Sequence, residues 1–117
     1  MPEKHYTGGC HCKKVRFEVT ADLDKAVSCN CSICSARGLL LTFTPAAQFK
    51  LLSGEDQTEY QFNKRKIHHL FCPVCGVESF ATGQDKSGAK TYAVNIRCLD
   101  DVDPASVKAM PFDGRSL

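Results

Sequence analysis

Short runs in which apolar and polar residues alternate dominate the chain. In residues 15–19 (VRFEV) every second side chain is apolar, and the positions between carry charge. Successive side chains of a β-strand point to opposite faces, so this alternation predicts a strand with one buried and one solvated face. Similar patterns, rich in β-branched and aromatic residues, occur in five further segments: 39–44, 58–63, 66–71, 77–82 and 91–96. We therefore expect a mainly β fold of antiparallel sheets.

Turn-forming residues separate the predicted strands at three places: 44–48 (TPAAQ), 53–56 (SGED) and 83–88 (GQDKSG). The first of these could form a short helical turn. The best helix candidate is 103–110, one or two turns in which Asp103 can act as N-cap and Pro104 takes the first helical position. We find no internal repeat, linker or low-complexity tract. The 117 residues therefore predict one domain over 1–117, with little helix.

Composition and charge narrow the class of protein. Apolar residues make up 43% and charged residues 24%, which is typical of a folded globular chain. A net charge of +2 is too small to indicate a nucleic-acid partner, and we interpret the one dense basic run, 63–66 (NKRK), as a solvated turn. No segment is long enough to span a bilayer, and the N-terminus lacks the apolar stretch of a secretory signal. We expect a cytoplasmic protein without a membrane partner.

The eight cysteines are the strongest chemical signal. Disulfides are rare in a reducing compartment, so metal ligation or thiol chemistry is the leading explanation for so many thiols. Cys98 stands alone, whereas the other seven form three closely spaced sets: Cys10 with Cys12, then Cys29 with Cys31 and Cys34, then Cys72 with Cys75.

The motif CPVCG at 72–76 indicates a metal knuckle, in which Gly76 takes a backbone conformation that a larger residue resists. It supplies two ligands and needs two more. Cys10 and Cys12, if they lie on extended chain, project to the same side and can complete a closed site of four thiolates. Free buried thiols or a redox C-x-x-C are the competing interpretations.

Cys29, Cys31 and Cys34 can all reach one ion but leave a tetrahedral ion one ligand short. Three protein ligands and a vacancy are typical of a catalytic zinc site. Alternatively, these thiols supply the missing ligands of the knuckle, or are buried as small apolar side chains. A small thiol suits the vacancy better than water does, because a zinc ion that carries three thiolates is a poor generator of hydroxide.

The segments GGCHCKKVRFEV, CNCSIC and FCPVCGVESF resemble, in this order, the signatures of the glutathione-dependent formaldehyde-activating (GFA) enzyme family. CNCSIC, FKLLSG, HLFCPVCGVESF and RCLD are most similar to the branch that includes centromere protein V. The resemblance implies a β-tent (Mss-type) zinc fold and two zinc ions per chain. It assigns Cys10, Cys12, Cys72 and Cys75 to a structural zinc, and Cys29, Cys31 and Cys34 to an open zinc that engages the sulfur of glutathione.

The resemblance also implies a carbon-sulfur lyase that joins glutathione, or a similar thiol, to a small aldehyde, as in the synthesis of S-hydroxymethylglutathione. The chain departs from the family at Lys13, where members usually carry glycine, and in 35–43 (SARGLLLTF), beside the open site. Other classes remain open. One is a zinc-stabilised module that binds glutathione or a protein without catalysis, and another is a redox or metal-storage protein. A nucleic-acid or cytoskeletal adaptor would need a basic extension.

Five residues outside the cysteine sets have candidate roles. His68 and His69 lie on opposite faces of one predicted strand, and we interpret the exposed one as a surface residue. Arg37 and Arg97 could each pair with a carboxylate of glutathione, although a solvated surface charge is the commoner role. Cys98 could approach the open site, but packing is more typical of a lone cysteine. Exposed strand edges make a homodimer possible.

Overall fold

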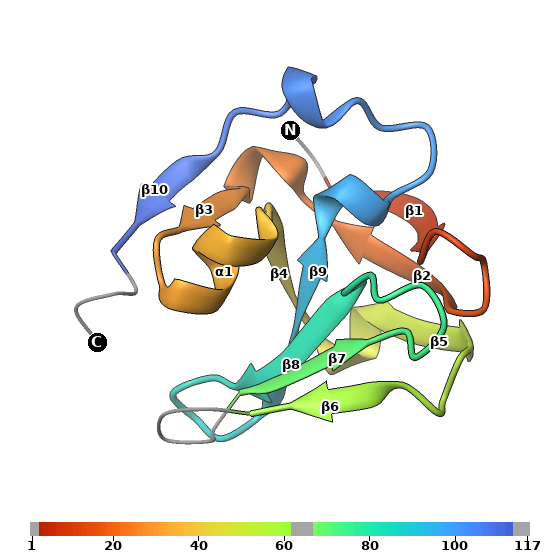
Figure 1. Ribbon diagram of the computed structural model, residues 1–117. Helices are drawn as coiled ribbons and strands as arrows, with labels where there is room; N and C mark the ends of the chain where they lie inside the picture. The colour runs from red at the N-terminus through yellow and green to blue at the C-terminus, as the bar shows by residue number, and fades with distance from the viewer. Residues whose placement is uncertain (1–2, 62–66, 114–117) are drawn as a thin grey trace.

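The computed structural model describes residues 3–61 and 67–113, and its elements are shown in Figure 1. The elements of these ranges, in chain order, are β1 (Lys4–Gly9), β2 (Arg16–Ala21), a 3₁₀ turn (Leu23–Lys25), β3 (Val27–Cys29), α1 (Ser32–Arg37), β4 (Leu41–Pro45), a 3₁₀ turn (Ala46–Gln48), β5 (Phe49–Ser53), β6 (Thr58–Tyr60), β7 (His68–Phe71), β8 (Phe80–Gln84), β9 (Lys90–Asn95), two 3₁₀ turns (Ile96–Cys98 and Pro104–Ser106) and β10 (Met110–Phe112). Within the described residues no helix is long and apolar enough to cross a membrane.

The strands form two sheets. A three-stranded sheet has the order β1-β2-β5, and a seven-stranded sheet has the order β10-β3-β4-β9-β8-β7-β6. Each neighbouring pair is antiparallel except β10 and β3, which run parallel at the end of the larger sheet. The predicted mainly β fold of antiparallel sheets with little helix is therefore confirmed.

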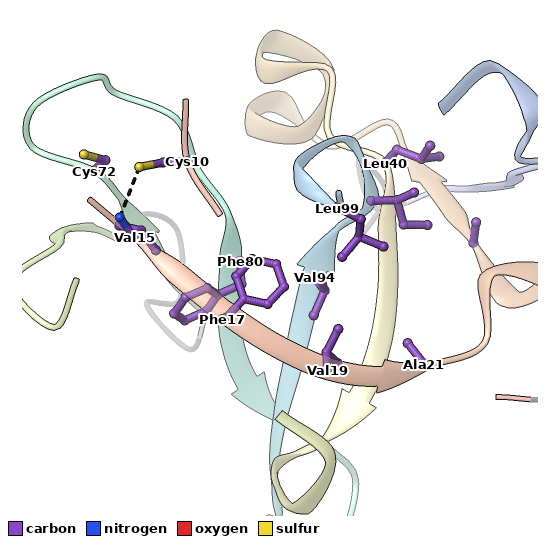
Figure 2. Close-up of a cluster of buried hydrophobic side chains, with 12 residues drawn as sticks. Cys10, Val15, Phe17, Val19, Ala21, Leu40, Cys72, Phe80, Val94 and Leu99 are labelled. Carbon is purple, nitrogen blue, oxygen red and sulfur yellow. Dashed lines mark hydrogen bonds between the residues drawn. The ribbon is translucent and has the colours of Figure 1, made fainter. Parts of the chain in front are cut away.

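Strand β2 shows the predicted alternation. Val15, just before it, and Phe17, Val19 and Ala21 within it are buried, with exposed fractions of 0 to 1%, while the residues between them are partly exposed. Burial of a side chain as large as Phe17 contributes roughly 2–3 kcal/mol. In Figure 2 the side chains of Phe17 and Val19 point from β2 towards Phe80 of β8 and Val94 of β9 in the other sheet. The core therefore lies between the two sheets.

An aromatic cluster joins the sheets at the centre of this core. Phe49 of β5 stacks on Phe17, with 5.3 Å between ring centroids, and on Tyr92 of β9, at 4.1 Å. Phe80 of β8 lies 4.7 Å from the Phe49 ring. Offset and tilted contacts of this kind add to the free energy of burial, so the relative position of the two sheets is well defined.

The observed helices and strands differ in places from those that the sequence pattern predicts. The predicted turn in 44–48 is confirmed as a 3₁₀ turn. Asp103 caps its turn by accepting from the Ala105 N–H at 3.0 Å, but only Pro104–Ser106 is helical, and Met110 begins a strand. The one α-helix of the described residues, α1, was not predicted. Strands missed in the sequence are β1, β3, β5 and β10. The predicted turn 63–66, the end of the predicted strand 58–63 and the start of 66–71 lie outside the described residues.

Candidate metal centres

Four cysteines from two distant segments meet at one end of the core. Cys10 and Cys12 follow β1, Cys72 and Cys75 follow β7, and their four sulfurs lie within 4.8 Å of one another. The Cys12 sulfur is 3.6 Å from the sulfurs of both Cys10 and Cys72. Four thiolates at about 2.3 Å from a tetrahedral zinc ion are separated by about 3.8 Å, whereas a disulfide requires about 2.05 Å. The cluster therefore fits one tetrahedral ion such as zinc.

Backbone donors surround these sulfurs. The Val15 N–H donates to the Cys10 sulfur at 3.2 Å, a contact drawn in Figure 2, and the N–H groups of Val74 and Cys75 donate to the Cys72 sulfur at 3.4 and 3.5 Å. Gly76 has a φ of 80°, as its place in the knuckle predicted, and its N–H donates to the Cys72 carbonyl at 2.9 Å. Such donors stabilise the thiolate form that a metal ion binds.

The geometry of the first cysteine pair differs from the prediction. Cys12 lies in a turn after β1 rather than on extended chain, and the turn is closed by the Lys13 N–H, which donates to the Cys10 carbonyl at 3.2 Å. Lys13 has a φ of 71°, in the left-handed region that favours glycine. The two sulfurs come together because the chain reverses direction, not because of the two-residue period of a strand.

The knuckle thiols have lowered pKa values. The N–H of Cys75 lowers the pKa of Cys72. Burial opposes ionisation of Cys75, but the amides of Val77 and Cys12 and the neighbouring thiols lower its pKa to about 6. A thiol with a pKa near 6, such as Cys75, is largely ionised at neutral pH and can bind a cation without first losing a proton.

The other three clustered cysteines surround the start of α1. Cys29 ends β3, Cys31 is the N-cap of α1 and Cys34 lies within the helix, and their sulfurs lie within 4.8 Å of one another. The Cys31 N–H donates to the Cys29 sulfur at 3.4 Å. Gly38, with a φ of 63°, ends the helix. Within the described part of the chain, no His, Asp, Glu or further Cys joins these three, so they could hold an ion with one position open.

The pKa values of Cys31 and Cys34 are shifted in opposite directions. Burial works against ionisation of Cys31, but the amides of Cys34 and Ile33 in the first turn of α1 lower its pKa below the ordinary thiol value. Burial raises the pKa of Cys34, which packs with Ile33, Leu39 and Leu41 in a small apolar cluster. Cys31 therefore ionises more readily than Cys34.

Three ionisable side chains, His69, Glu78 and Arg37, are paired beside the three cysteines. The side chain of His69 is 6% exposed and that of Glu78 is 2% exposed, and the His69 Nδ1 lies 2.9 Å from a Glu78 carboxylate oxygen. Arg37, from the last turn of α1, forms an ion pair with the other oxygen, and its guanidinium lies 5.1 Å from the centre of the Phe71 ring. Arg37 is thus already paired with a carboxylate of the protein.

Sequence patterns placed the two histidines on opposite strand faces but did not include His69 among the site residues. His69 lines a cavity of about 620 Å³ together with Cys29, Cys31 and Cys34. His68 lines a different cavity, of about 710 Å³, and pairs with the partly exposed Glu59 at 2.9 Å. The available signal was the strand alternation, which separates the two rings without indicating which face is covered.

The remaining candidates lie outside both cysteine clusters. The Nε of Arg97 donates to the Gly38 carbonyl at 3.0 Å, beside the end of α1. Cys98 is half-buried, and its sulfur lies 3.8 Å from the Glu78 carbonyl oxygen. Burial raises the pKa of Cys98 to about 11. These contacts favour the packing interpretation of Cys98.

Comparisons with known proteins agree with this geometry. Residues 5–112 match the family model described as glutathione-dependent formaldehyde-activating enzyme, and this range includes every cysteine of the chain. A Rhodobacter sphaeroides protein with a known crystal structure has 32% sequence identity to this chain, and the two structures superpose with a TM-score of 0.79. The match covers 90% of this chain and 97% of that one, so the two proteins share the fold over nearly their whole lengths.

Proposed function

The chain belongs to the glutathione-dependent formaldehyde-activating (GFA) family, and from this premise we propose that it is a zinc-dependent enzyme of the carbon-sulfur lyase type. In the proposed reaction a glutathione-like thiol adds to a small aldehyde. One observation carries the proposal: three cysteine sulfurs within 4.8 Å of one another border the same cavity as His69, which is paired with the buried Glu78. The motifs shared with the branch that includes centromere protein V support a place in that branch.

In this proposal Cys10, Cys12, Cys72 and Cys75 hold a structural zinc. Their sulfurs connect the turn after β1 to the loop between β7 and β8, segments about sixty residues apart in the chain. A metal that binds the folded arrangement and not the separate segments stabilises the fold by its binding free energy. These residues therefore contribute to stability rather than to the reaction.

Cys29, Cys31 and Cys34 hold the second zinc, which would favour the thiolate form of a bound substrate thiol near neutral pH. Because the three cysteines line the cavity, a thiol bound at this site would place its sulfur at the cavity wall. When the sulfur attacks the aldehyde, a C–S bond forms, the C=O π bond breaks and the oxygen gains a proton. The thiol loses one proton and the oxygen takes one, so the reaction needs a proton carrier and no oxidant.

His69 is the proposed proton carrier. The Glu78 carboxylate lies 2.9 Å from the His69 Nδ1, and His69 lines the cavity that the three cysteines border. A buried carboxylate fixes the orientation of the ring, as in other histidine–carboxylate pairs. Arg37 in turn compensates the buried charge of Glu78, which would otherwise be costly.

The test combines metal analysis with activity. Elemental analysis should give two zinc ions per chain in the wild type, one in Cys31→Ser and two in the control Cys98→Ser, whose sulfur lies outside both clusters. Reduced glutathione should perturb only the second zinc. Exchange between free and thiol-bound formaldehyde, followed by ¹³C NMR, should exceed the uncatalysed rate in the wild type and fall to that rate in Cys31→Ser.

A different result would favour a different function. One zinc ion in both the wild type and Cys31→Ser, with no response to glutathione, would refute the enzyme and leave a zinc-stabilised binding module. Two zinc ions with glutathione binding but no acceleration of exchange would indicate a glutathione-binding module. Metal that leaves readily, from thiols that oxidise quickly, would indicate a redox or storage role.

A further inference from the structure

The wall of the cavity beside the three cysteines is mostly apolar. Apolar side chains come to it from β3, β4, β9 and β10 and from the residue before β7. These are Val27, Leu41, Phe43, Ile67, Ala93 and Phe112. Ligand cavities of about 300–1,000 Å³ are commonly apolar with a few polar groups, and this one, at about 620 Å³, fits that description.

At this wall, strand β4 buries polar side chains and exposes an apolar one, the reverse of the usual pattern. Thr42 and Thr44 are 1% and 2% exposed and donate to the carbonyl oxygens of Asp22 and Thr20, whereas Phe43 between them is 55% exposed. A strand that buries its threonines and exposes its phenylalanine departs from the pattern that folding alone favours. Such departures are expected at functional sites.

Two further large apolar side chains lie at the same cavity. Ile67 is 53% exposed and Phe112 is 49% exposed, and both line the cavity with Phe43. Single exposed apolar residues are common on protein surfaces, but several gathered at one hollow indicate a binding surface. A ligand that covered these three side chains would gain the free energy of removing them from water.

The charges that the described residues place at this wall do not suit an anionic ligand. Among the described lining residues there is no Lys or Arg, and the only carboxylate is that of Asp85. Asp85 accepts from the N–H groups of Ser87 and Ala89 at 2.8 and 3.0 Å and from the Ser87 hydroxyl at 2.6 Å, so it serves the turn between β8 and β9. The described wall therefore suits an uncharged apolar group better than a carboxylate.

We infer that the aldehyde handled at this site carries an apolar group of several carbons, an aliphatic chain or an aromatic ring. This group packs against Phe43, Ile67 and Phe112 while the carbonyl carbon lies near Cys29, Cys31 and Cys34. The inference names the electrophile of the proposed function and rests on it for the reaction, whereas the apolar binding surface does not depend on catalysis. Formaldehyde has no group that could use this wall.

Two measurements on the zinc-loaded wild-type protein test the inference. In the first, unreactive primary alcohols from ethanol to hexanol are titrated into ¹⁵N-labelled protein, and affinity is read from amide shifts. Each added methylene should tighten binding about two- to fourfold, with the largest shifts at Phe43, Ile67 and Phe112. In the second, kcat/KM for formaldehyde, propanal and hexanal with glutathione, each divided by the uncatalysed rate constant, should rise with chain length.

Two matched variants test whether the preference for long-chain aldehydes depends on the apolar side chains of this cavity. Phe43→Ser should lower kcat/KM for hexanal about tenfold more than kcat/KM for formaldehyde, and should weaken hexanol binding by a similar factor. Leu52→Ser removes an apolar side chain that is 50% exposed on β5 and does not line this cavity, so it should change neither ratio. A larger effect on KM than on kcat is expected, because Phe43 contacts the apolar group and not the reacting atoms.

The outcomes separate this inference from the proposed function. If no aldehyde reacts faster than in buffer but the alcohols bind as described, the proposed function fails and the apolar site stands. If formaldehyde is turned over but chain length has no effect on rate or binding, the proposed function stands and the inference is wrong. It is also wrong if the alcohols do not bind and sedimentation shows a dimer that Phe43→Ser dissociates, since the wall is then a subunit interface.

Discussion

Replacing Lys13 with glycine should stabilise the protein. Lys13 closes the turn between Cys10 and the start of β2, and its φ of 71° lies in the left-handed region. In that region the Cβ of an L-residue approaches the following carbonyl oxygen, which costs about 1–2 kcal/mol. Glycine has no Cβ, and it is the residue that the family resemblance puts at this position.

The expected gain is smaller than the strain itself. Glycine makes the unfolded chain more flexible, which offsets about 0.4–1 kcal/mol of the relief. The Lys13 side chain is exposed, so its removal sacrifices little packing. A net gain of about 0.5–1 kcal/mol corresponds to a rise in Tm of about 2–5 °C for a chain of 117 residues.

Thermal unfolding at a fixed zinc concentration measures the change, and Lys13→Ala is the matched control. Alanine removes the same charge and side chain but keeps a Cβ, so its Tm should not rise. Zinc content should be equal in all three proteins, since binding of metal to the folded state also raises Tm. An unchanged or lower Tm for Lys13→Gly, or an equal rise for Lys13→Ala, would refute the argument from backbone strain.

Three further predictions follow from particular contacts. Glu78→Gln should reduce the free energy of unfolding by about 2–4 kcal/mol in urea denaturation, because it removes the buried carboxylate that pairs with both His69 and Arg37. Glu59→Gln changes an exposed pair of the same 2.9 Å length and should cost less than about 1 kcal/mol. Equal losses would contradict the role of burial. Gly76→Ala should weaken zinc binding in competition with a chromophoric chelator, because the φ of 80° strains alanine, although no atom beyond the adjacent residues lies within 4 Å of the added Cβ. Unchanged affinity would show that the knuckle tolerates a Cβ. Hydrogen bonding and charge from Arg16 lower the pKa of Asp100 to about 2, so this contribution to stability is complete above the unfolded pKa of about 3.9 and is lost as the pH falls towards 2. The difference in the free energy of unfolding between wild type and Asp100→Asn should therefore shrink over that pH range. A difference that stays constant with pH would count against the assignment.

The parts of the site that depend on neighbours in the chain were predictable. The spacing of Cys72 and Cys75 and the glycine that follows them specify a local turn, and the structure has that turn. The pairing of Cys10 with Cys12 was also expected, but for the wrong reason, because a residue in the left-handed region reverses the chain there. A lysine at position 13 gives no composition signal for such a turn, whereas a glycine would have done so.

The trio of His69, Glu78 and Arg37 could not be predicted in the same way. It joins β7, the segment before β8 and the last turn of α1, so no spacing along the chain relates the three residues. Helix α1 itself is short and lies inside a cysteine motif, where Gly38 after Arg37 is the only clear stop signal. Alternation showed that His68 and His69 face opposite ways, and only the packing of the sheets decided which face is buried.

The sequence by itself determined that this chain forms short antiparallel strands and gathers its thiols into sets able to bind metal, since strand periodicity and cysteine spacing depend on a few consecutive residues. The tertiary structure decided which sets meet, which histidine is buried and which apolar side chains remain in water around a cavity. Those features depend on how two sheets pack, and packing brings together residues that are far apart in the chain. The most specific chemistry of the site, the buried His69–Glu78 pair and the exposed Phe43, belongs to this second group.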